Sequence, residues 1–191
     1  MHQVGLFFGS FNPIHIGHLA LANYMAEFEE LDEVWFVVSP QNPFKEATDL
    51  IAAQHRLNMV DQAIQHYPKL KAEAIELSLP VPSYTIDTLR ALSKLHPTHR
   101  FHIIMGEDNI HHIDRWKEAD QWVGHFPILV YPRLGYEINN DQLPPLCKVT
   151  EAPVVEMASS NIRAWIHSGK DLPFFVSTPV MTYIKAHQLY Q

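Results

Sequence analysis

Two histidines, His15 and His18, lie in the segment with the clearest chemical meaning, Gly-Ser-Phe-Asn-Pro-Ile-His-Ile-Gly-His at residues 9–18. An apolar run at residues 4–8 precedes it and predicts a buried strand, while the pattern that follows predicts a helix. A helix N-terminus carries unpaired N–H groups and a partial positive charge, so it attracts phosphate. The two imidazoles would add donors at the same place. We therefore expect this segment to bind a polyphosphate and to stabilise the charge on it during group transfer.

A second segment with phosphate-binding chemistry is Ser-Ser-Asn-Ile-Arg at residues 159–163. Ser159 and Ser160 stand where a further helix is predicted to begin, and hydroxyls there can cap the helix and bind phosphate together. Arg163 follows about one helical turn later, so its guanidinium could bridge neighbouring phosphates of a nucleotide.

These segments need a scaffold that brings them together, and the sequence predicts one. Apolar runs alternate with helical patterns along the whole chain, which predicts an α/β fold, doubly wound around a mainly parallel sheet. We expect strands over residues 4–8, 34–38, 71–75, 101–105, 127–131 and 154–157, and a loop over residues 135–148. We expect helices over residues 19–28, 52–65, 85–95, 110–123, 159–168 and 179–190. In such folds ligands bind at the carboxyl ends of the strands, so residues 9–18, 106–108 and 159–163 should converge on one cleft.

Bulk composition narrows the functional classes. The chain has 191 residues, which fits one domain over residues 1–191, and 47% of them are apolar. A formal charge of −7 argues against a general nucleic-acid binder. The single cysteine, Cys147, excludes a disulfide framework, and no apolar run approaches the ~20 residues that span a membrane. We expect a cytoplasmic protein whose partners include neither nucleic acid nor membrane; an oligomer remains open.

Residues 9–18 resemble the signature of the nucleotidyltransferase superfamily, Gly-x-Phe-Asp-Pro-x-His-x-Gly-His, with Asn12 where aspartate is commoner. Residues 157–163 resemble its second motif, Ile-Ser-Ser-Thr-x-Ile-Arg, with Ala158 in place of the first serine and Ser160 in place of the threonine. The resemblance implies a Rossmann-like nucleotidyltransferase fold. It also implies a reaction that needs no general base. Histidine, lysine and arginine side chains of the pocket, together with the Mg²⁺ that accompanies ATP, would stabilise the charge on the phosphates.

Three further segments resemble one branch of that superfamily, the nicotinate (nicotinamide) mononucleotide adenylyltransferases of the bacterial nicotinate-nucleotide type. They are Ser83-Tyr84-Thr85 and its continuation to residue 89, Gly106-Glu107-Asp108 followed by Trp116, and residues 133–136. The resemblance implies adenylyl transfer from ATP to nicotinate mononucleotide, which gives nicotinic acid adenine dinucleotide and pyrophosphate in NAD biosynthesis.

The same resemblance assigns roles to individual residues. The expected catalytic residues are His15, His18 and Arg163; no residue is expected to bind a metal directly. The expected ATP-binding residues are Gly9, Ser10, Phe11, Gly17, Gly106, Asp108, Ser159, Ser160 and Arg163. The expected mononucleotide-binding residues are Lys45, Ser83, Tyr84, Thr85, Trp116 and Arg133, with Trp116 stacking on the pyridine ring. Arg56 either lies near phosphate, as the resemblance implies, or occupies a solvated or ion-paired helix position.

Four alternatives remain at this stage. The mononucleotide could carry nicotinamide instead of nicotinate. Phosphopantetheine adenylyltransferase shares the first motif but lacks the segment at residues 83–89. Class I aminoacyl-tRNA synthetases share His-Ile-Gly-His but carry a Lys-Met-Ser-Lys-Ser loop that this chain lacks. A metal-binding or nucleotide-sensing module could use His15, His18, His111 and His112, although adjacent histidines on a helix point apart.

Overall fold

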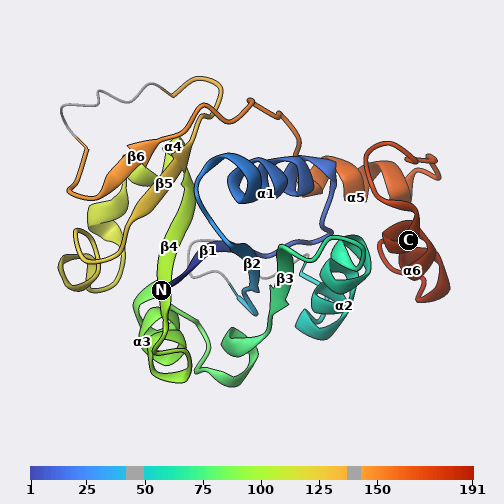
Figure 1. Cartoon of the computed structure of the whole chain (residues 1–191). Helices are drawn as coiled ribbons and strands as arrows, with labels where there is room; N and C mark the ends of the chain where they lie inside the picture. Colours follow the sequence, from blue (N-terminus) through green and yellow to red (C-terminus); the bar gives the residue numbers. More distant parts are fainter. Residues whose placement is uncertain (42–49, 137–142) are drawn as a thin grey trace.

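Six parallel strands form one sheet in the computed structural model, which describes residues 1–41, 50–136 and 143–191. The strands are β1 (His2–Gly9), β2 (Glu33–Val38), β3 (Leu70–Glu73), β4 (His99–Gly106), β5 (Ile128–Tyr131) and β6 (Cys147–Val149). Their order across the sheet is β3-β2-β1-β4-β5-β6, so β1 and β4 lie at the centre (Figure 1). This order confirms the predicted α/β, doubly wound parallel sheet.

Helices connect the strands and cover the sheet. They are α1 (Ile16–Phe28), α2 (Ala53–Ile64), α3 (Thr85–Leu95), α4 (Glu107–Ile110), α5 (Ser159–His167) and α6 (Thr178–Ala186). Short 3-10 helices occur at Ile75–Ser78, Ile113–Arg115 and Ala119–Gln121. No helix within the described part of the chain is long and apolar enough to cross a membrane.

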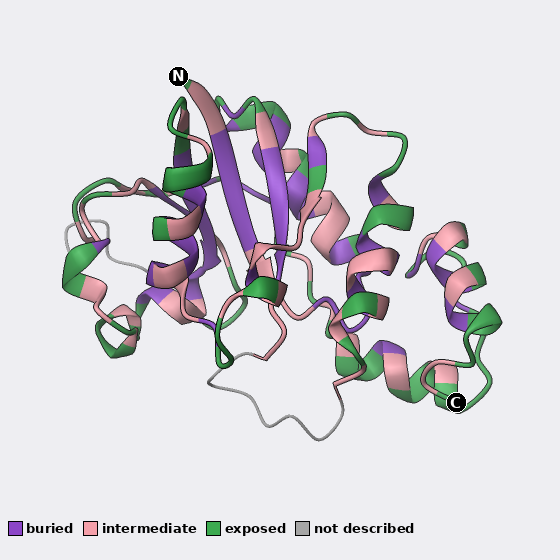
Figure 2. Cartoon of the chain, turned by 90° about the horizontal axis from the view of Figure 1, so that it is seen from below, coloured by how far each residue is buried: buried purple, intermediate pink, exposed green. Residues whose placement is uncertain are grey.

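Successive residues of the central strands face opposite sides of the sheet, and each side has its own core. On one side Phe7 and Phe36 pack with residues of α1, α2 and α6. On the other side Leu6 and Ile103 pack with residues of α3. Right-handed crossovers explain the division, because the chain moves outward through β2 and β3 and then returns to β4 on the other side of β1. Figure 2 shows the inner strands buried along most of their length and the helices exposed on their outer surfaces.

Two predicted elements are wrong. Residues 154–157 form no strand; β6 is Cys147–Val149, which begins inside the region predicted as loop, and it pairs in parallel with β5. Residues 110–123 form no continuous helix: α4 ends at Ile110, the Trp116 backbone is extended with ψ 143°, and Glu118 is left-handed with φ 49°. The other predicted elements are present, with ends that differ by a few residues.

The sheet topology explains where a ligand can bind. The connection after β1 runs towards β2 and the connection after β4 runs towards β5, so the two loops diverge from neighbouring strands. A crevice therefore forms at the carboxyl ends of β1 and β4.

Candidate active site

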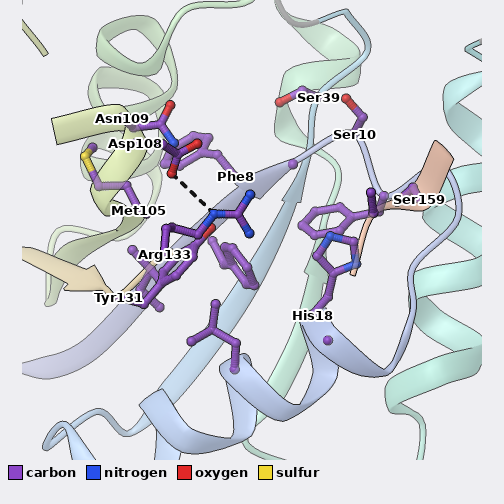
Figure 3. Close-up of a pocket in the computed structure, with 18 of the residues that line it drawn as sticks. Phe8, Ser10, His18, Ser39, Met105, Asp108, Asn109, Tyr131, Arg133 and Ser159 are labelled. Atoms are coloured by element: carbon purple, nitrogen blue, oxygen red, sulfur yellow. Dashed lines mark ion pairs between the residues drawn. The ribbon is translucent and has the colours of Figure 1, made fainter. Parts of the chain in front are cut away.

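A cavity of about 770 Å³ occupies this crevice, which is the size range of small-molecule sites. Most of the site residues predicted from the sequence line this cavity. They are Gly9, Ser10, Phe11, His15, Gly17, His18, Gly106, Asp108, Trp116, Arg133, Ser159, Ser160 and Arg163. Figure 3 shows two walls. One carries Ser10, His18, Ser39 and Ser159, and the other carries Asp108, Asn109, Tyr131 and Arg133.

His15 and His18 lie at the N-terminus of α1 with their rings stacked at a centroid separation of 3.8 Å. His15 is only 3% exposed, and neither of its ring nitrogens has a hydrogen-bond partner among the described residues. Burial lowers the pKa of His15 to about 4, so the ring is neutral at physiological pH. A buried polar group without a partner is unusual in a folded protein. The ring nitrogens of His15 therefore have hydrogen-bonding capacity that a ligand in the cavity could use.

The local geometry also orients His18. Its Nδ1 accepts the main-chain N–H of His15 at 3.3 Å, which leaves Nε2 as the ring nitrogen that can donate to a ligand. Gly17 between them has a packing role, since a Cβ there would lie 3.1 Å from Nδ1 of His15 and 3.2 Å from Val155. A side chain at residue 17 would therefore press on the His15 ring.

The loop before α1 is joined to α5 at the other side of the cavity. Arg163 donates from its guanidinium to the carbonyl of Asn12 at 3.0 Å, and the Ser159 hydroxyl donates to the carbonyl of Pro13 at 3.0 Å. The two predicted phosphate-binding segments are thus in direct contact, although more than 140 residues separate them. Ser160 lines the cavity and is exposed.

Arg56 is neither beside the cavity surface nor solvated. Its guanidinium is fully buried and donates to the carbonyls of Ser10 and Ser39, each at 2.6 Å, and of Pro40 and Ile51, each at 3.0 Å. Ser10 follows β1 and Ser39 follows β2, so Arg56 holds the carboxyl ends of two strands together from behind the cavity.

Asp108 and Arg133 contact each other on the opposite wall. The Arg133 Nε lies 3.6 Å from Oδ1 of Asp108, an ion pair drawn in Figure 3, and that Oδ1 has no hydrogen-bond partner among the described residues. The neighbouring carboxylate of Glu107 accepts the main-chain N–H of Arg133 at 2.8 Å. A Cβ at Gly106 would collide with Oδ1 of Asp108, so a side chain there would displace the Asp108 carboxylate. The resemblance assigns Asp108 to ATP and Arg133 to the mononucleotide, yet the two side chains form an ion pair with each other.

Trp116 is half-buried, lines the cavity and packs beside Trp122 at a centroid separation of 5.8 Å. The segment at residues 83–85 does not line the cavity. Its Ser83 hydroxyl donates to Glu76 at 2.6 Å, the Tyr84 ring lies under the Lys117 ammonium at 4.3 Å, and Thr85 begins α3. Lys45 lies outside the described residues, and its assignment remains a prediction.

Comparisons with known proteins identify the family. The family described as Cytidylyltransferase-like matches residues 6–170. A protein of Bacteroides fragilis named "Probable nicotinate-nucleotide adenylyltransferase" is 48% identical over 93% of this chain and 89% of its own length. A protein of Flavobacterium johnsoniae with the same name is 42% identical over 99% of both chains. This chain belongs to the nicotinate-nucleotide adenylyltransferase family.

A solved structure confirms the fold expected of this family. The nicotinic acid mononucleotide adenylyltransferase of Plasmodium falciparum, complexed with NaAD, superimposes with a TM-score of 0.82. It is 21% identical, and the match covers 100% of this chain and 98% of that one. The chain therefore has the Rossmann-like nucleotidyltransferase fold that its motifs predict.

The structure adds cavity residues that the motifs of the nicotinate-nucleotide adenylyltransferase family did not indicate. They include Ser39, Asn109, His112, Arg115 and Tyr131. Ser39 and Tyr131 could have been found from the sequence, because each lies at the carboxyl end of a predicted strand. Asn109 lies in α4, directly after β4. His112 and Arg115 lie within residues 110–123, where the prediction of a regular helix does not indicate which side chains face the cavity.

Across residues 1–41, 50–136 and 143–191, no group of three or more His, Cys, Asp or Glu side chains is arranged to hold a metal ion. The alternative of a histidine-based metal module therefore gains no support from these residues.

Proposed function

We propose that the protein transfers the adenylyl group of ATP to nicotinate mononucleotide, forming nicotinic acid adenine dinucleotide and releasing pyrophosphate. The observation that carries the proposal is the stacked pair of His15 and His18 at the N-terminus of α1, with the ring nitrogens of His15 buried and unpartnered beside a cavity of nucleotide size. Imidazole nitrogens and helix N–H groups together form a site suited to phosphate oxygens. The family membership identifies the nucleotide chemistry to which such a site belongs.

The reaction is a displacement at the α-phosphorus of ATP. A phosphate oxygen of the mononucleotide forms the new P–O bond, and the bond between the α-phosphorus and the bridging oxygen breaks, so the electron pair leaves with pyrophosphate. The attacking phosphate is already ionised at neutral pH, so the protein needs to align the reactants and stabilise charge rather than remove a proton. We assign charge stabilisation to His15, His18 and Arg163, which surround the loop at the start of α1.

Mg²⁺ is expected to enter with ATP. The described residues supply single carboxylates such as Asp108 rather than a cluster of ligands, and Mg²⁺ is commonly held by substrate phosphates with one or two carboxylates and water. When bound there, the ion neutralises phosphate charge.

The mononucleotide is assigned to the part of the cavity that contains Trp116. An indole face that is half-exposed to a cavity can stack on a pyridine ring. Arg133 and the segment at residues 83–85 remain further candidates, and the latter would need to act from outside the cavity lining.

A pyrophosphate-release assay with ATP and Mg²⁺ tests the proposal. Nicotinate mononucleotide and nicotinamide mononucleotide are compared as acceptors, and the dinucleotide product is identified by chromatography. A preference for the acid supports the proposal, while a preference for the amide replaces the substrate and retains the chemistry. If pyrophosphate is released with neither of the two mononucleotides, the proposal is contradicted and phosphopantetheine is the next acceptor to test.

A further inference from the structure

Tyr190 makes an unexpected contact with the loop that precedes the two histidines. Its phenol hydroxyl donates to Oδ1 of Asn12 at 2.7 Å, across 178 residues of sequence. Asn12 is 5% exposed and lines the cavity, whereas Tyr190 does not line it. Tyr190 therefore lies behind the loop, and its hydrogen bond to Asn12 connects it to the cavity.

The phenol is held firmly in this position. Tyr190 follows α6 and packs, partly buried, against the core that α1 and α2 share. The preceding residue, Leu189, donates its main-chain N–H to Ile184 of α6 at 3.0 Å. Tyr190 itself has φ 63°, a left-handed conformation that a non-glycine residue adopts only when surrounding contacts maintain it. Burial raises the pKa of its phenol, so the hydroxyl keeps the proton that it donates.

The loop that receives this hydrogen bond is the one that positions His15. Pro13 and Ile14 separate Asn12 from His15, the residue that caps α1. The main chain of Asn12 is already held by Arg163 at 3.0 Å, and Tyr190 adds a restraint on its side chain. A main-chain restraint alone leaves the side-chain torsions of Asn12 to be set by other contacts. The hydrogen bond from Tyr190 therefore contributes to both the rotamer of Asn12 and the path of the loop.

We propose that Tyr190 is a positioning residue for adenylyl transfer: through its hydrogen bond to Asn12 it holds the loop that places His15 and His18 against the phosphates. The inference rests on the proposed function for its kinetic consequence, but its structural part is independent of the substrate. Because aspartate and asparagine both offer an oxygen at this position, the same phenol could position either residue.

Tyr190→Phe removes only the donated hydrogen bond, and Tyr183→Phe is its matched control. The Tyr183 hydroxyl also belongs to the α6 region, but it bonds to Asn58 at 2.8 Å and His55 at 2.9 Å on α2 rather than to the loop. We expect Tyr190→Phe to lower kcat roughly tenfold, because one buried hydrogen bond is lost at the group that orients the histidines. Tyr183→Phe should lower the melting temperature and leave kcat within about twofold of wild type.

Two further measurements separate positioning from general stability. In an Asn12→Ala background, Tyr190→Phe should change kcat by less than about twofold, since the acceptor is already absent. Hydrogen exchange of main-chain amides at residues 14–19 should become at least about threefold faster in Tyr190→Phe and stay unchanged in Tyr183→Phe. An equal loss of kcat with and without Asn12 would overturn the proposal, as would unchanged kcat together with unchanged exchange.

Pyrophosphate release by the wild-type protein shows whether the proposed function or the positioning role of Tyr190 has failed. If the wild type releases no pyrophosphate from ATP with any acceptor, the proposed function fails and the exchange experiment alone decides. Faster exchange at residues 14–19 in Tyr190→Phe but not in Tyr183→Phe would then still support the positioning role, and identical exchange in both variants would refute it.

Discussion

Arg56→Met removes the guanidinium behind the cavity and keeps an unbranched side chain. Four main-chain carbonyls lose a charged donor, and they belong to Ser10, Ser39, Pro40 and Ile51. Because Arg56 is fully buried, water cannot replace those hydrogen bonds without disturbing the packing around α2.

The size of the effect follows from two opposing contributions. Hydrogen bonds from a charged donor contribute about 1.5–3 kcal/mol each, so four contribute roughly 6–12 kcal/mol. Burial opposes them: it lowers the pKa of Arg56 to about 10, and the difference from the ordinary value corresponds to about 3 kcal/mol against the charged form. Breaking a buried charged network typically costs about 3–5 kcal/mol. We expect the free energy of unfolding to fall by about 4 kcal/mol. This value is near the lower end of what remains when the burial cost is subtracted from the contribution of the four hydrogen bonds.

Urea unfolding followed by circular dichroism measures this loss. Arg90→Met is the matched control, because Arg90 is half-exposed and its ion pair with Glu118 at 2.7 Å lies at the surface. That variant should lose less than about 1 kcal/mol. Arg56→Lys keeps the charge but lacks the planar fork, so it should recover less than about half of the loss. An Arg56→Met protein within about 1 kcal/mol of wild type, or full recovery by lysine, would refute the reasoning.

Three further predictions concern the cavity. His18→Ala should lower kcat by about 10²–10³, because one lost donor to a developing charge costs about 2.7–4 kcal/mol. Steady-state kinetics at saturating substrate measures this loss, and near-normal turnover would exclude His18 from charge stabilisation. Burial lowers the pKa of His15 to about 4, so the unfolded chain binds a proton that the folded chain excludes as the pH falls from about 6.5 to about 4. This residue should therefore reduce the free energy of unfolding by up to about 3 kcal/mol across that window; urea unfolding of wild type and His15→Gln at pH 7 and 4.5 checks it, and parallel losses would contradict it. Trp116→Ala should raise the KM for the mononucleotide more than the KM for ATP, since stacking serves one ring; equal increases would make Trp116 a packing residue.

The phosphate-binding segments could be found from the sequence because their chemistry is local. A strand, a turn and a helix start within eighteen residues are encoded by neighbouring side chains, and the N-terminus of α1 follows directly from them. The strand order is more remote, but alternating elements and right-handed crossovers leave few arrangements. The convergence of residues 9–18, 106–108 and 159–163 on one cavity could be predicted for that reason.

The errors in the secondary structure have a different origin. Residues 154–157 have the apolar character of a strand, yet Cys147–Val149 pairs with β5, because pairing depends on which segment reaches the sheet edge. Residues 110–123 have a helical pattern, but α4 ends at Ile110, the Trp116 backbone is extended and Glu118 is left-handed, so the chain follows an irregular path there. In both places tertiary packing overrides local preference.

The sequence by itself determined the family, the parallel α/β scaffold and the pair of histidines at a helix N-terminus, because each depends on residues close together in the chain. Only the tertiary structure decided what holds that pair in place. Arg56 reaches Ser10 across 46 residues, and Tyr190 reaches Asn12 across 178, so no local pattern marks either contact. The tertiary structure also decided that Arg56 is a buried residue that binds main-chain carbonyls rather than phosphate. The burial of Arg56 and its hydrogen-bond partners arise only when α2, β1 and β2 pack together.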